Sequence, residues 1–105
     1  QDYVRQFMSL LSLHFREQRL VTFYSEQMHI TPKYLGTIVT QQTGRTVSDW
    51  IDHFVVSEAK VLLGSSSLTI QEITYKLNFP NQSFFCKYFK AHTGMTPSGF
   101  RAHHQ

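Results

Sequence analysis

The sequence predicts an all-α protein: two helix-turn-helix units joined by a long linker helix, with about seven helices in all. One observation is that apolar residues recur every three or four positions along the chain, and no segment keeps the strict alternation of a half-buried strand. The other is an internal repeat. Thr43-Gly44-Arg45-Thr46 returns fifty residues later as Thr93-Gly94-Met95-Thr96.

The composition fits one small globular domain spanning residues 1–105. Hydrophobic residues make up 41% of the chain, and nine Phe, five Tyr and one Trp can fill a core. The net charge of +3 is compatible with a polyanionic partner but does not identify one. The single cysteine excludes an internal disulfide framework. The apolar runs are shorter than the ~20 residues that a membrane span requires.

The first helix-turn-helix unit is expected over residues 1–46. Amphipathic spacing predicts helices at residues 2–16, 20–28 and 33–43. Thr31 is a typical N-cap, Pro32 suits the first helical position, and Gly44 suits a left-handed stop. The apolar residues expected on the inner face of the second helix are Leu20, Tyr24 and Met28.

Residues 47–64 are expected to form the linker helix. Thr46 and Asp49 have the spacing of a capping box, with Asp in the usual place of Glu. Trp50 is expected to be a buried anchor at the start of this helix. The broad apolar face predicted for the helix comprises Trp50, Ile51, Phe54, Val55, Ala59, Leu62 and Leu63.

The second helix-turn-helix unit is expected over residues 65–105. Thr69 caps a short helix, Asn78 can adopt a left-handed turn conformation, and Asn81 caps a helix over residues 82–93. Thr96-Pro97 begins a last short helix. Equivalent residues lie forty-nine apart in the first helix of each pair and fifty apart in the second, so this unit has one extra turn residue.

DNA contact is expected from the outward faces of the third and sixth helices. A recognition helix places its N-terminal residues against base edges in the major groove. Gln82 can pair with adenine and Lys87 with guanine, whereas the first unit offers shape, thymine-methyl and backbone contacts. The candidate contact residues are Lys33, Gly36, Thr37, Thr40, Gln82, Ser83, Cys86, Lys87 and Lys90.

Phosphate contacts are expected at helix N-termini and from arginines. Thr31 and Asn81 begin their helices with unpaired backbone N–H groups, which suit an anion. Arg45 and Arg101 are further candidates, and Lys90 is better placed for a phosphate than for a base.

A spaced motif runs through the second half of the chain: Ile70-x-x-Ile73-Thr74-x-x-x-Asn78-Phe79, then Asn81-Gln82-Ser83-Phe84-Phe85-x-Lys87-x-Phe89-Lys90-x-x-x-Gly94-x-Thr96-Pro97-x-x-Phe100-Arg101. It resembles the C-terminal DNA-binding domain of AraC/XylS-family transcription regulators. The resemblance implies seven helices, activation or repression of bacterial transcription, and base contacts from Lys33, Gly36, Thr37, Gln82, Ser83 and Lys87.

The expected partner is double-stranded DNA, with RNA polymerase as a further candidate. Ligand sensing and dimerisation are expected to belong to a missing N-terminal part, and the protein is expected in the cytoplasm with the nucleoid. The alternative is a helical protein-interaction module that keeps the fold without base recognition. No nucleophile with a base and an orienting group is evident, so an enzyme is not expected. No cofactor or metal is expected, because the histidines have no ligand spacing.

Overall fold

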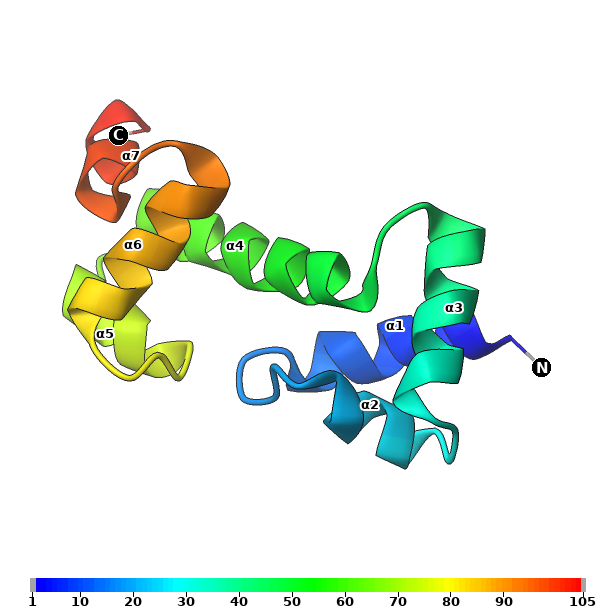
Figure 1. The fold of residues 1–105 in the computed structure, drawn as a ribbon. Coiled ribbons are helices and arrows are strands. Elements are labelled where there is room, and N and C mark those ends of the chain that lie inside the picture. The colour runs from blue at the N-terminus through cyan, green and yellow to red at the C-terminus, as the bar shows by residue number, and fades with distance from the viewer. Residues whose placement is uncertain (1, 105) are drawn as a thin grey trace. The chain divides into compact units, whose positions relative to one another are not determined.

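The computed structural model describes residues 2–104, and these residues form helices without any strand (Figure 1). The prediction of an all-α fold with seven helices is confirmed. The helices are α1 (Tyr3–His14), α2 (Val21–Gln27), α3 (Pro32–Thr43), α4 (Val47–Ser65), α5 (Ile70–Lys76), α6 (Gln82–Thr93) and α7 (Pro97–His103). Two compact units divide between residues 54 and 55, inside α4.

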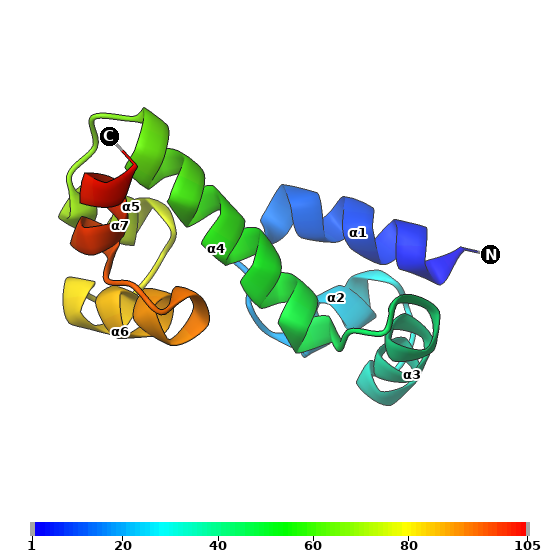
Figure 2. The same ribbon diagram turned by 90° about the horizontal axis from the view of Figure 1, so that it is seen from above.

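The first unit contains α1, α2, α3 and the beginning of α4. Figures 1 and 2 show α1 and α2 side by side, with α3 crossing them. Tyr24 is fully buried, its ring meets the Phe7 ring edge-on at 5.6 Å, and its hydroxyl donates to the Gln18 carbonyl at 2.7 Å. The apolar core of this unit comprises Phe7, Leu11, Phe15, Tyr24, Met28, Leu35, Val39, Val47 and Ile51.

The second unit contains the rest of α4 with α5, α6 and α7. Its core is rich in phenylalanine: Phe89 lies between Phe85 and Phe100, with ring centroids 6.0 and 5.5 Å away. Arg101 ties α7 to α4. Its Nε donates to the Leu63 carbonyl at 3.0 Å, which satisfies one of the carbonyls that a helix end leaves without a partner.

The helix ends form as the sequence predicts. The side chain of Thr31 accepts from the Tyr34 amide, and that of Asn81 accepts from the Phe84 amide. Gly44 and Gly94 end α3 and α6 in the left-handed conformation, with φ of 79° and 82°. The capping box at Thr46 is also present, because Thr46 and Asp49 exchange hydrogen bonds of 3.3 and 3.0 Å.

The two helix-turn-helix turns begin with the same left-handed geometry. His29 and Asn78, forty-nine residues apart, both have positive φ, 57° and 61°. The left-handed conformation predicted for Asn78 is confirmed, and that of His29 was not predicted. The N-caps Thr31 and Asn81 lie fifty apart. The extra residue of the second turn is therefore Pro80, which stands between Phe79 and the N-cap.

Two expectations about the core are wrong, and one helix boundary differs slightly from the expected one. Leu20 is the N-cap of α2, so it precedes the buried stripe of that helix and is 71% exposed. Trp50 is only half-buried, because the buried stripe of α4 follows every fourth residue and Trp50 lies beside it. Helix α4 also continues through Gly64 to Ser65. The buried stripe comprises Val47, Ile51, Val55, Ala59 and Leu63.

Candidate DNA interface

Helix α3 presents the predicted residues on its outward side. Leu35 and Val39 are fully buried, and a rotation of 100° per residue turns the predicted set away from them. Lys33, Thr37 and Thr40 are exposed. Gly36 is half-exposed.

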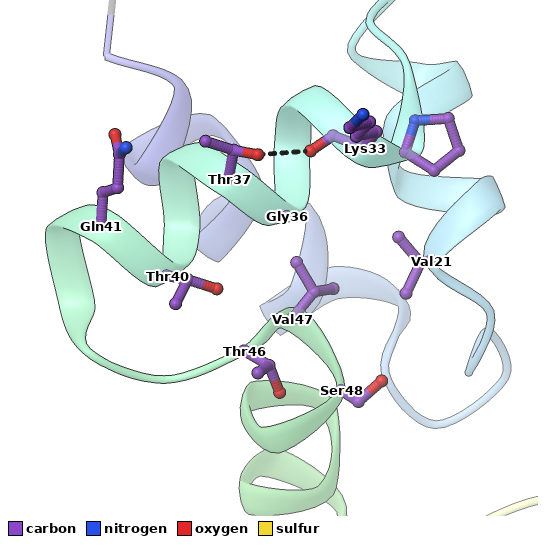
Figure 3. A pocket seen from close by; sticks show the side chains of 10 residues that line it. Val21, Lys33, Gly36, Thr37, Thr40, Gln41, Thr46, Val47 and Ser48 are labelled. Atoms are coloured by element: carbon purple, nitrogen blue, oxygen red, sulfur yellow. Dashed lines mark hydrogen bonds between the residues drawn. The ribbon is translucent and has the colours of Figure 1, made fainter.

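Most of this face is chemically sparse. The Thr37 hydroxyl donates to the Lys33 carbonyl at 3.0 Å (Figure 3). Because that hydrogen is engaged with the helix backbone, Thr37 offers the surface a methyl group and an acceptor oxygen but no free donor. Gly36 adds no side chain, and Lys33 is the only charged residue of the predicted set here.

A groove of about 570 Å³ lies along this side of α3 (Figure 3). Its other walls are Val21 at the start of α2 and residues 46–48 at the start of α4. Gln41 also lines the groove but was not among the predicted residues, and its position four residues after Thr37 was the available signal. The residues that α3 contributes are Pro32, Lys33, Gly36, Thr37, Thr40 and Gln41.

Helix α6 presents a more strongly polar face, with lysines at 87 and 90 in the places of Thr37 and Thr40. Phe85 and Phe89 are fully buried. The residues predicted to face DNA lie opposite them: Gln82, Ser83, Lys87 and Lys90 are exposed, and Cys86 is half-buried. This face combines an amide, a hydroxyl and two ammonium groups within three turns of helix.

The predicted phosphate residues differ in what holds them. Thr31 and Asn81 each use a side-chain oxygen to cap their helix, so an anion would meet backbone amides there. Arg45 is exposed, with its guanidinium 5.1 Å from the Trp50 ring centroid. Arg101 is half-buried and donates to the carbonyls of Leu63 and Leu62, and its phosphate contact stays a prediction.

Two acidic groups with shifted pKa values belong to the fold rather than to these faces. Burial raises the pKa of Tyr24 to about 12, and the charge of Arg19 opposes this rise. Hydrogen bonds from the backbone and side chain of Thr69 lower the pKa of Glu72, which completes the capping box of α5. Both groups therefore make folding depend on pH.

The described residues, 2–104, contain neither a candidate metal site nor a candidate membrane span. Within this range, no group of three or more His, Cys, Asp or Glu side chains is arranged to hold a metal ion. None of the helices in the same range has both the length and the apolar character needed to cross a membrane.

Two helix pairs, each with a left-handed turn before a capped second helix that has an exposed face, define a double helix-turn-helix protein. A family model described as a helix-turn-helix domain matches residues 24–103. The chain belongs to the AraC-type helix-turn-helix family, as its sequence motif predicted. It is a DNA-binding domain of a transcription regulator and not an enzyme.

Curated relatives support the assignment. The arabinose operon regulatory protein of Escherichia coli K12 is 29% identical over 100 residues, which cover 94% of this chain and 34% of that protein. The HTH-type transcriptional activator RhaR of Escherichia coli O1:K1 / APEC is 38% identical over 78 residues, covering 74% of this chain and 28% of RhaR. The chain thus spans about a third of the length of these relatives.

Solved structures share the fold. The C-terminal domain of AraT, a response regulator from Geobacillus stearothermophilus, matches with a TM-score of 0.91 at 25% identity, covering 98% of this chain and 86% of that one. The DNA-binding domain of AdpA, solved in complex with a target DNA, matches with a TM-score of 0.86 at 19% identity, covering 98% and 93%. At that identity the second match concerns the fold alone.

Proposed function

We propose that this chain binds a specific DNA sequence by placing α3 and α6 in two successive major grooves, with α6 making most of the polar base contacts. The observation that carries this proposal is the exposed polar face of α6, set opposite its buried phenylalanines. The second helix of a helix-turn-helix pair, with such a face exposed, suits the major groove.

Each side chain of the α6 face has a distinct role in this proposal. Gln82 lies at the first position of the helix, where an amide can pair with the N6 and N7 edge of adenine. Lys87 can reach O6 and N7 of guanine, and Ser83 can serve either base. Lys90, one turn further on, contacts phosphate and carries no sequence preference.

Residues of the first unit would contact the DNA at the other of the two major grooves. Lys33 begins the exposed face of α3, and Arg45 follows its C-cap. Arg45, together with the backbone amides that follow Thr31 and Asn81, would bind phosphates. Successive major grooves repeat about every 34 Å, so we expect a bound site with two blocks of sequence about one helical turn apart.

The rest of the regulator is part of the same proposal. Because the chain corresponds to about a third of the arabinose regulator, we propose that a further N-terminal region senses a ligand or dimerises. RNA polymerase is the further partner that we propose for this chain. The site of action would be the nucleoid, in the bacterial cytoplasm.

The test is selection of binding sites from random duplex DNA with the parent chain, followed by titration of variants on the selected duplex. We expect Gln82→Ala and Lys87→Ala to relax base preference at separate positions of one block, each by about 1–3 kcal/mol. Lys90→Ala should weaken all sequences alike. Lys60→Ala, which removes an exposed lysine from α4, is the matched charge control.

The salt dependence separates this function from a protein-interaction module. The slope of log K against log salt should be about −0.9 for each phosphate contact, and Lys90→Ala should reduce its magnitude by about one contact. If the parent selects no sequence and its binding does not depend on salt, the proposal is wrong. If both α6 variants keep the parent's preferences, α6 does not recognise the bases.

A further inference from the structure

Gly36 lies inside α3, where the fold does not require a glycine. Its φ is not in the left-handed region, unlike that of Gly44 at the end of the same helix. A Cβ built on Gly36 would have no other atom within 4 Å beyond its local backbone. Glycine inside a helix is less favourable than alanine, because the unfolded chain loses more conformational freedom. The fold therefore carries an unfavourable residue on the face that points toward DNA.

The neighbours of Gly36 make this position shallow and apolar. Thr37 turns its hydroxyl to the Lys33 carbonyl, which leaves its methyl on the surface. The groove along α3 passes Gly36, with Val21 and Val47 on its far wall (Figure 3). A small apolar group can approach the α3 backbone closely here, which a longer side chain would prevent.

The second unit has no equivalent of this arrangement. The residues fifty positions after Gly36 and Thr37 are Cys86 and Lys87, which fill the corresponding surface of α6 with a thiol and a long cationic chain. The two faces therefore suit different base edges. The major-groove edge of thymine is distinguished by its C5-methyl group, which pairs with apolar contacts such as a threonine methyl.

We propose that α3 recognises a thymine by its C5-methyl group, which lies over Gly36 and against the methyl of Thr37. Gly36 is present because it lets the α3 backbone come close to that base pair. This inference rests on the proposed function, in which α3 occupies a major groove.

Replacing thymine by uracil in the DNA tests the inference without changing the protein. Each thymine of the selected duplex is replaced in turn by deoxyuridine, which removes only the C5-methyl group. Burial of one such carbon group corresponds to roughly a fourfold change in affinity. We expect at least one replacement in the block bound by α3 to weaken the parent about fourfold. If no replacement in that block changes the affinity, the inference is overturned.

A substitution of Thr37 locates the contact in the protein. Thr37→Ser keeps the hydroxyl that donates to Lys33 and removes only the methyl. We expect the preference of this variant for thymine over uracil at that one position to fall from about fourfold to near one. A preference that stays unchanged would mean that another residue contacts the methyl, which contradicts the proposal.

The Gly36→Ala variant tests the close approach. It should melt at a higher temperature than the parent, because alanine favours the helix and its methyl meets open space. It should nevertheless bind the selected duplex at least tenfold more weakly. Gly64→Ala is the control, since Gly64 is also helical with no atom near its Cβ but lies near the end of α4. Unchanged or tighter binding by Gly36→Ala would overturn the inference.

These outcomes can be told apart from failure of the proposed function. If the α6 variants alter base preference while uracil and Gly36→Ala have no effect, only the inference about α3 is wrong. If the parent selects no DNA sequence at all, the proposed function fails, and the inference fails with it.

Discussion

Trp50→Ala should destabilise the first unit strongly while leaving the DNA contacts in place. The Trp50 indole Nε1 donates to Thr43 Oγ1 at 2.9 Å, and the Arg45 guanidinium lies over the ring. Truncating a fully buried Trp costs about 3–5 kcal/mol. Because Trp50 is half-buried, we expect a loss of about 3 kcal/mol, hydrogen bond included. For a domain of this size that lowers the melting temperature by roughly 10–20 °C.

Trp50→Phe supplies the matched control, because the second unit already has Phe100 at the equivalent position. This variant keeps most of the ring and loses the indole hydrogen bond, so we expect a cost of only about 1 kcal/mol. Thermal unfolding of both variants is followed by DNA titration well below the midpoint. If Trp50→Ala melts like the parent yet loses DNA binding, Trp50 contacts DNA, and its role in stabilising the first unit is wrong.

Three further predictions concern single contacts. Arg101→Met should lower stability by about 1–2 kcal/mol, because α4 loses two hydrogen bonds, whereas Arg45→Met should leave the melting temperature near that of the parent and weaken DNA binding. Tyr24→Phe should remove a loss of stability that the parent shows at alkaline pH. In the parent, the stability that comes from neutral Tyr24 is complete below pH 10 and is lost as the pH rises through about 12, and urea unfolding measures this change. Glu72→Gln should make stability depend less on pH in the acid range. The lowered pKa of Glu72 gives stability that is present above pH 4.5 and is lost as the pH falls through the pKa of the folded protein.

The sequence predicted local structure well where one residue type decides the geometry. Gly44 and Gly94 end their helices as expected, because a left-handed residue needs no Cβ. Thr31 and Asn81 cap as expected, since their side-chain oxygens reach the amide three residues on. These features depend on four or five consecutive residues, so no tertiary information is needed to place them.

The sequence predicted less well where burial depends on packing. Trp50 and Leu20 are strongly apolar, yet hydrophobicity does not say which side of a helix meets a neighbour or where the helix begins. The hydrogen bonds of Arg101 to carbonyls of α4, thirty-eight and thirty-nine residues earlier in the chain, were not foreseen, and its phosphate contact stays a prediction. Contacts at that separation leave no periodic signal in the sequence.

The bulky side chains of the two cores come from different helices. In the first unit the large fully buried residue on the leading helix of the pair is Tyr24, and the following helix buries Leu35 and Val39. In the second unit the equivalent leading residue is Ile73, and the following helix buries Phe85 and Phe89. The largest side chains of the two cores therefore come from opposite helices of the pair: the first helix in the first unit and the second helix in the second unit.

The outward faces of α3 and α6 also differ between the two units. None of the four corresponding pairs on these faces has the same charge and the same size. The pairs are Lys33 with Ser83, Gly36 with Cys86, Thr37 with Lys87 and Thr40 with Lys90. Because a solvent-facing side chain has no neighbour whose volume it must match, exchanging it leaves the fold nearly unaffected. A duplicated scaffold can therefore keep one set of caps and turns while its two exposed helices come to recognise different base pairs.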